Sequence, residues 1–311
     1  MAAHPSSPQT RWYGPPMVAL GAGLWGVETL FRVNLQQHFK SDVLVFFEHV
    51  VSLAIAVPLL LWNIRAALAM SRRSFGWMLV SAIVGSAFGT VFFTASLARM
   101  NVSVANVLLN LQPLWSVFVA RMVLGEKISR KIGPWAVLAL ASGILLSLES
   151  FDLTRLQVQD PLGLLFVLGT IFCWGTATVA GRALMGETPL VVAAPLRMII
   201  GTFGTLAIVG FNGHFGEMTS QIPLLGEGPI LTEYLKLMLI AGFTPVFFYF
   251  YGLKYTSAVA GTFCEMSQTL VALLVTWGVM GHALAAHQIV AGVLLVGAVA
   301  RISLLQARVI Q

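Results

Sequence analysis

Charged residues are scarce in this chain. Asp, Glu, Lys and Arg together make up 10% of its 311 residues, whereas soluble proteins carry about 25%. Hydrophobic types make up 58%, and a water-soluble fold with this composition would expose large apolar patches and aggregate. The apolar content is enough for about ten spans of roughly 20 residues each. The composition therefore predicts an all-α polytopic membrane protein.

Other absences exclude further classes of protein. Only two cysteines occur, Cys173 and Cys264, which excludes a disulfide-stapled secreted domain. The net charge of +6 is not gathered into one basic patch, so no nucleic-acid partner is expected. The sequence has no phosphate-binding loop, no H-E-x-x-H zinc motif and no convincing G-x-S-x-G nucleophile, so no enzyme is expected. No cofactor or metal is expected either, because His282 and His287 lack a neighbouring Cys or acid.

Ten apolar runs have the length of a membrane-spanning helix. Each is predicted to be helical, because lipid offers no hydrogen-bond partner to an open strand edge. Residues 1–16 precede them as a polar segment without a convincing cleavable signal. Prolines interrupt four of the runs, at positions 58, 113, 195 and 245. The predicted spans are 17–33, 42–62, 75–97, 103–122, 132–148, 161–183, 190–211, 231–252, 258–280 and 284–305.

The placement of Lys and Arg predicts the orientation of these spans. With the N-terminus in the cytoplasm, 12 of the 18 Lys and Arg residues lie at cytoplasmic ends and five at outer ends. The outer loops also hold most of the acidic residues between spans. This asymmetry follows the positive-inside rule. We therefore expect a multi-pass protein of the cell membrane with the lipid bilayer around it and both termini in the cytoplasm.

The sequence also repeats itself weakly. A shift of 149 places Trp25-Gly26 on Trp174-Gly175 and Glu48 on Arg197, and a shift of 156 places Gln112 on Gln268. Two repeats of five spans follow, residues 17–148 and 161–305. Because five is odd, the second repeat is expected to be inverted relative to the first, with the substrate site between the two.

The most distinctive stretch lies between residues 98 and 143. It contains N-V-S-V-A-N-V-L-L-N-L-Q-P-L-W, then L-G-E-K-I-S at 124–129, then a span rich in small residues. This stretch resembles the EamA-type repeat of the drug/metabolite transporter superfamily, as do the Trp-Gly pairs of the first and sixth spans. The resemblance covers nearly the whole chain. It implies ten helices, an inverted repeat and the transport of small metabolites, often as export.

Ionisable residues inside the predicted spans are the first candidates for the site, because such charges are costly in a bilayer. Glu28 and Glu48 lie in an outer layer, and Arg197 and Glu265 lie in an inner layer at a common depth. Depth therefore argues against a Glu48–Arg197 pair and allows an Arg197–Glu265 ion pair. Arg32, at i+4 from Glu28, either neutralises it or extends outward. One outer carboxylate is then expected to lack a partner and to suit proton exchange.

Polar and aromatic side chains add to this set. Asn106 and Asn110 share one face of the fourth span, and Thr262 and Glu265 share a face of its repeat counterpart. Such stripes predict either a cavity or hydrogen bonds between helices. Trp25 and Trp174 either hold an aromatic or quaternary ammonium ligand or pack beside their glycines. The predicted substrate-binding residues are Trp25, Glu28, Glu48, His49, Asn106, Asn110, Trp174, Arg197, Thr262 and Glu265.

The sequence thus predicts a secondary transporter that works by alternating access. We expect its substrate to be a small amine-bearing or amphiphilic metabolite, such as an amino acid or a quaternary amine, with protons as a potential coupling ion. Two alternatives stay open at this stage. One is a passive facilitator or channel, and the other is a membrane-embedded enzyme or receptor.

Overall fold

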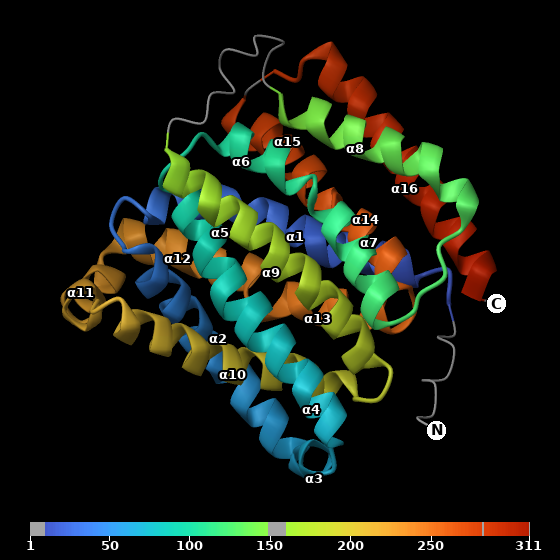
Figure 1. Cartoon of the computed structure of the whole chain (residues 1–311). Coiled ribbons are helices and arrows are strands. Elements are labelled where there is room, and N and C mark those ends of the chain that lie inside the picture. The colour runs from blue at the N-terminus through green and yellow to red at the C-terminus, as the bar shows by residue number, and fades with distance from the viewer. Residues whose placement is uncertain (1–9, 149–159, 282, 311) are drawn as a thin grey trace.

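The computed structural model describes residues 10–148, 160–281 and 283–310 (Figure 1). These residues form helices joined by short connections and contain no strand. Helices satisfy their own backbone hydrogen bonds, which the hydrocarbon core of a bilayer demands. The prediction of an all-α polytopic membrane protein is confirmed. Of the predicted N-terminal segment 1–16, residues 1–9 lie outside the described residues.

The helical segments follow the predicted spans closely. In the first half they are α1 (Gly14–Leu35), α2 (Ser41–Trp62), α3 (Ile64–Leu68), α4 (Arg72–Leu79), η1 (Val80–Gly89), α5 (Thr90–Leu97), α6 (Val102–Leu109), α7 (Gln112–Val123), η2 (Arg130–Ile132) and α8 (Gly133–Ser147). In the second half they are α9 (Pro161–Met185), α10 (Leu190–Phe211), α11 (Phe215–Gln221), η4 (Ile222–Gly226), α12 (Gly228–Ala241), α13 (Phe243–Lys254), α14 (Ala258–Cys264), α15 (Ser267–Met280) and α16 (Ala286–Ile310).

Eight segments of the described chain are long and apolar enough to cross a bilayer, so the predicted count of ten is not reached by this measure. The helices α1 and α8 occupy the positions of the first and fifth predicted spans. The α8 helix has 15 residues, or about 22 Å of length, which is less than a hydrocarbon core of about 30 Å. The α1 helix has 22 residues but carries Glu28 and Arg32.

The two halves contact each other in a reciprocal pattern. The α1 helix packs against α13 and α15 of the second half, while its counterpart α9 packs against η1 and α7 of the first half. The pairs α2–α10 and α8–α16 join equivalent spans. Two copies related by a pseudo-two-fold axis give this exchange of contacts.

Equivalent spans also begin in the same way. Asn101 accepts a hydrogen bond from the backbone N–H of Ser103 and caps α6, and Ser257 accepts one from Ala260 and caps α14. Positions 101 and 257 are 156 residues apart, the shift of the sequence repeat. These side chains satisfy backbone donors that the first helical turn leaves free.

Four spans that border the interior are irregular. The fourth span breaks between α6 and α7, and the ninth breaks between α14 and α15. The third span runs as a π-helix over η1, and the eighth breaks at Gly242 between α12 and α13. Interrupted helices in a membrane are tolerated where their freed backbone groups face protein or a cavity.

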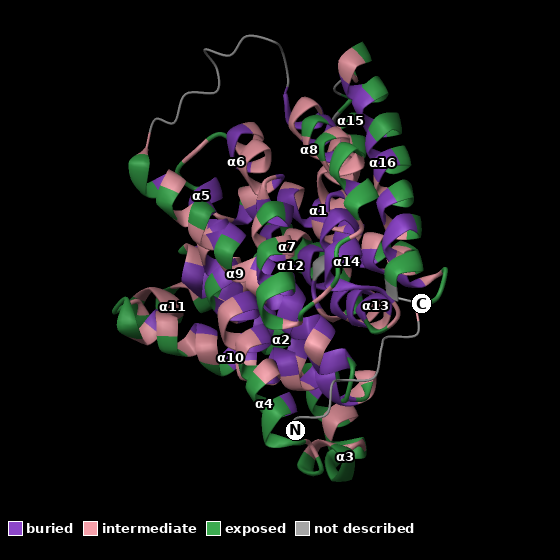
Figure 2. Ribbon diagram, turned by 45° about the vertical axis from the view of Figure 1, so that its right-hand side comes forward, coloured by how far each residue is buried: buried purple, intermediate pink, exposed green. Residues whose placement is uncertain are grey.

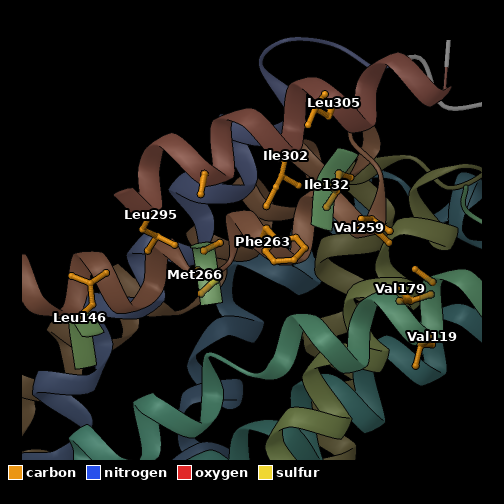
Figure 3. Packing of buried hydrophobic residues seen from close by; sticks show 14 of the residues in the cluster. Val119, Ile132, Leu146, Val179, Val259, Phe263, Met266, Leu295, Ile302 and Leu305 are labelled. Atoms are coloured by element: carbon orange, nitrogen blue, oxygen red, sulfur yellow. The ribbon is translucent and has the colours of Figure 1, made fainter. Parts of the chain in front are cut away.

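The apolar packing separates a protein-facing surface from a lipid-facing one. On the buried face of α16, Leu295 and Ile302 form one cluster with Leu146 and Phe263 of neighbouring helices (Figure 3). The outward face of α16 is exposed (Figure 2) and bears apolar residues such as Val293, which is 70% exposed. A soluble helix would place polar residues on such a face, so lipid is its natural solvent.

Candidate functional site

A cavity, called here the central cavity, lies between the two halves of the chain and is lined by polar, charged and aromatic side chains from both. Seven of the ten predicted site residues line it. They are Trp25, Glu28, Glu48, His49, Trp174, Arg197 and Glu265.

The other three predicted residues, Asn106, Asn110 and Thr262, line a smaller cavity, called here the side cavity. The central and side cavities share four lining residues and so adjoin each other. These shared residues are Gln112, Trp174, Glu265 and Gln268.

Arg32 holds the two outer carboxylates of the central cavity together. Its guanidinium lies 2.8 Å from Glu48 and 3.3 Å from Glu28, and it donates a further hydrogen bond to Thr94 at 2.9 Å. The expectation that one outer carboxylate lacks a partner is therefore wrong. An arginine presents several N–H donors in a planar fork, so one guanidinium serves an acid on its own helix and another on α2. The cluster keeps one more formal negative charge than positive charge.

The expected ion pair between Arg197 and Glu265 is also absent from the described residues. Arg197 donates to the backbone carbonyl of Ser81 at 3.3 Å and lies over the ring of Phe250 at 5.4 Å. Its guanidinium is thus stabilised by a carbonyl and by the face of an aromatic ring. Depth along the span, which suggested the pair, leaves the lateral direction of each side chain undetermined.

Glu265 instead accepts hydrogen bonds from three other spans. Tyr249 on α13 and Thr178 on α9 donate to Oε1 at 2.5 and 2.8 Å, and Gln112 on α7 donates to Oε2 at 2.6 Å. Neutral donors in a low-dielectric interior satisfy a carboxyl group without a counter-ion. Glu265 therefore joins both halves at the point where the ninth span is interrupted.

His49 is held by both of its ring nitrogens. Nδ1 lies 2.8 Å from the carbonyl oxygen of Val45, and Nε2 lies 2.8 Å from the hydroxyl oxygen of Ser86 on η1. Because a carbonyl oxygen only accepts, Nδ1 carries the proton and donates. These contacts fix the ring between α2 and the π-helix at the wall of the central cavity.

Aromatic rings form the wall of the central cavity around these polar groups. Trp25 contacts Tyr249 with ring centroids 5.0 Å apart, and Trp174 contacts Phe93 at the same separation. The glycines beside the two tryptophans let other helices approach closely, because a Cβ at Gly26 would collide with the carbonyl oxygen of Gln268 and one at Gly175 with the side chains of Trp115 and Ser116. Trp25 and Trp174 therefore pack against neighbouring rings and also line the central cavity, so a packing role and a ligand-binding role are compatible.

Asn110 serves mainly to join helices. Its amide group donates to the carbonyl of Gly143 and to the hydroxyl of Ser147, both at 3.0 Å, and its oxygen accepts from Thr269 at 3.2 Å. Thr262 differs, because its side chain is fully buried and its hydroxyl has no hydrogen-bond partner among the described residues. The polar stripes of spans four and nine therefore contain both helix-joining contacts and free groups.

Several residues of the site are not in the predicted set. The sequence draws attention to Arg32 through its i+4 spacing to Glu28, and to Gln112 and Gln268 through their equivalence in the repeat. Nothing in the sequence singles out Tyr249, because it is an uncharged residue within a predicted span and belongs to no recognised motif. The described residues contain no group of three His, Cys, Asp or Glu side chains suited to a metal. His282 lies outside the described residues.

Comparison with known proteins agrees with this architecture. The profile of the EamA-like transporter family matches residues 12–148 and again residues 161–304. The chain is 26% identical over 302 residues to the riboflavin transporter ImpX of Fusobacterium nucleatum subsp. nucleatum, covering 93% of this chain and 97% of that protein. A solved crystal structure shares the fold with a TM-score of 0.74 and 17% identity, over 96% of this chain and 99% of the other. The chain belongs to the EamA-like transporter family, as the sequence resemblance implied.

Proposed function

We propose that this EamA-family membrane protein is a secondary transporter for a small amphiphilic metabolite with a planar aromatic ring, and that riboflavin is its substrate. The observation that carries the proposal is the central cavity, where aromatic walls surround a set of hydrogen-bonding and charged groups. The relative that is named a riboflavin transporter supports the choice of substrate.

The chemistry of the central cavity suits a ring that is apolar on its faces and polar on its edges. Trp25, Trp174 and Tyr249 offer ring faces for stacking. Gln112 and Gln268 offer carboxamides, which both donate and accept hydrogen bonds. A flavin ring carries both kinds of surface, so it satisfies the rings and the amides together.

Alternating access is the mechanism that the architecture supports. The substrate cavity lies between two reciprocally packed halves, and the four spans with irregular helices border it. In transporters with inverted repeats, one half rocks against the other around such a site. We propose that residues 17–148 and 161–305 are these halves, with both termini in the cytoplasm as the positive-inside rule requires.

An amine-bearing metabolite is a second candidate substrate. Three carboxylates, from Glu28, Glu48 and Glu265, line the central cavity against two guanidinium groups, from Arg32 and Arg197. The formal surplus is one negative charge, which a substrate cation or a bound proton offsets. Proton coupling through Glu28 or Glu48 belongs to the same proposal.

Counterflow in proteoliposomes tests the proposed substrate. Vesicles loaded with unlabelled riboflavin are expected to take up labelled riboflavin faster than empty vesicles, whereas a channel shows no such stimulation. Trp25→Ala is expected to reduce the exchange at least tenfold, and Trp62→Ala, at a residue that is 90% exposed, serves as the control. Chromatography of the vesicle contents excludes an enzyme if the substrate is recovered unchanged.

Two results of the same assay decide against parts of the proposal. If wild-type protein exchanges a quaternary amine or an amino acid and not riboflavin, the second candidate replaces the first. If riboflavin uptake shows the same response to an imposed pH gradient in wild type and in both Glu28→Gln and Glu48→Gln variants, neither residue couples transport to protons.

A further inference from the structure

The side cavity has a different chemistry from the central cavity. Its lining comes from both interrupted helices, α6–α7 and α14–α15, with one residue, Trp174, from α9. Carboxamide and hydroxyl groups dominate its polar surface, and Trp174 stands at the junction of the two cavities. The side cavity is thus a polar extension of an aromatic site.

Several polar groups of the side cavity are free to bind a ligand. The Thr262 side chain is 0% exposed, and its hydroxyl has no hydrogen-bond partner within the described residues. The carboxamides of Asn106 and Gln268 also form no side-chain hydrogen bond in the part of the chain that the structure describes. Buried polar groups are normally hydrogen-bonded, and one without a partner calls for an explanation.

Hydroxyl groups of a ligand match these side chains. A hydroxyl donates one hydrogen bond and accepts two, and a carboxamide both donates and accepts. Among the described residues that line the side cavity, Glu265 alone is ionisable, and its carboxyl oxygens already accept hydrogen bonds from Tyr249, Thr178 and Gln112. The free groups are therefore neutral, which favours a neutral polyhydroxylated ligand over a cation.

We propose that the side cavity binds a polyhydroxylated chain attached to the aromatic ring that occupies the central cavity. This inference rests on the proposed function and refines it, because it makes the chain of riboflavin a determinant of specificity. Trp174 marks the boundary between the ring site and the chain site, and Asn106, Thr262 and Gln268 recognise the hydroxyl groups.

Two probes separate the contributions of ring and chain. Riboflavin carries a ribityl chain, and lumiflavin carries the same ring system with a methyl group in place of that chain. In proteoliposomes, the KM for riboflavin counterflow and the inhibition constant of lumiflavin are measured for wild type, Thr262→Val and Asn106→Leu. Valine keeps the shape of threonine, and the Thr262 hydroxyl has no hydrogen-bond partner to lose among the described residues, so this variant is expected to retain the fold.

The KM for riboflavin is expected to rise about tenfold in each variant, because one buried hydrogen bond to the chain is lost. The inhibition constant of lumiflavin is expected to stay unchanged. Thr276→Val is the matched control: its hydroxyl donates to Ala272 at 2.8 Å within α15, and it lines neither cavity. Both constants are expected to match wild type in this control.

Other outcomes overturn the inference. If Thr262→Val and Asn106→Leu weaken riboflavin and lumiflavin equally, or weaken neither, the side cavity does not bind the chain while riboflavin transport itself stands. If wild type exchanges neither flavin, the proposed function fails and this inference fails with it.

Discussion

The hydroxyl of Tyr249 donates a hydrogen bond to Glu265 Oε1 over 2.5 Å. This contact links α13 to the interruption between α14 and α15, and Thr178 on α9 donates to the same oxygen. Since Tyr249 also packs against Trp25, it couples a carboxyl group of the cavity to an aromatic wall. Glu265 is thus stabilised by neutral donors in place of the arginine that its depth suggested.

Tyr249→Phe is expected to destabilise the protein by about 1–3 kcal/mol, because it removes one donor from a buried carboxyl group. Thermal unfolding in detergent measures this loss. Tyr251→Phe, on the same helix but outside the central cavity, is the control and is expected to change stability by less than about 0.5 kcal/mol. Equal effects of the two substitutions would contradict the role of the Tyr249 hydroxyl.

Arg32→Met is expected to cost about 3–5 kcal/mol, because it leaves Glu28 and Glu48 buried without their shared cation. Combining it with Glu28→Gln and Glu48→Gln is expected to restore most of the stability. Denaturation midpoints of the single and triple variants provide the test. A triple variant no more stable than Arg32→Met would show that the cost arises from lost packing and not from charge.

A matched control for Arg32 lies at the surface. Arg99 pairs with Asp160 at 2.9 Å, and their side chains are 45% and 31% exposed. Water screens such a pair, so Arg99→Met is expected to change stability by about 0–1 kcal/mol. The contrast between the two arginines isolates the effect of burial on an ion pair.

The carboxyl group of Glu126, at the N-terminal end of α14, is expected to make the stability of the protein depend on pH. Its carboxyl oxygens accept hydrogen bonds from the backbone N–H groups of Ala258 and Val259 at 2.9 and 3.1 Å. Burial nevertheless raises the pKa of Glu126 above its ordinary value of 4.5. The folded state therefore binds this proton more tightly than the unfolded state, so its contribution to stability is present at low pH and is lost as pH rises.

The measurement compares wild type with Glu126→Gln, which does not titrate. The free energy of unfolding of wild type, relative to the variant, is expected to fall as pH rises from 4.5 through the raised pKa of Glu126, and to level off above it. Thermal unfolding between about pH 4 and pH 8 covers this window. A relative stability that increases with pH would mean that the two backbone donors outweigh burial.

Gly26→Ala is expected to destabilise the protein by about 1–3 kcal/mol through overpacking. The added Cβ collides with the backbone oxygen of Gln268, and Gln268 lines both cavities, so transport is expected to fall as well. Gly76→Ala provides the matched control, because nothing lies within 4 Å of its Cβ position. In a helix this control is expected to be neutral or to stabilise by up to about 1 kcal/mol.

The predicted spans agree with the helices because the position and length of each apolar run along the sequence determine both. A run of apolar residues with the length of a bilayer must be helical, and α2 and α10 begin and end within about one residue of the predicted limits, whereas α16 continues five residues beyond its predicted end. The interruptions were only partly visible. Pro113 lies directly after the break in the fourth span, but the ninth span breaks at Glu265–Met266 without a proline.

Many of the residues that line the two cavities could likewise be selected from the sequence, because ionisable and aromatic residues deep in a span are costly or conspicuous. Their partners were not. Depth along a helix follows from residue number, and it argues against a Glu48–Arg197 contact. The rotation of each helix and the direction of each side chain do not follow from residue number. They determine that Arg32 pairs with Glu48 and that Tyr249 and Thr178 donate hydrogen bonds to Glu265.

Composition and spacing alone determined that this chain is a helical membrane protein built from two related halves, because the bilayer imposes its length and its polarity on every span. The tertiary structure decided which buried charges neutralise one another and where the two cavities lie. These properties depend on lateral packing between helices that are far apart in the chain, and that packing is set by small residues such as Gly26 and by interruptions that no single span reveals.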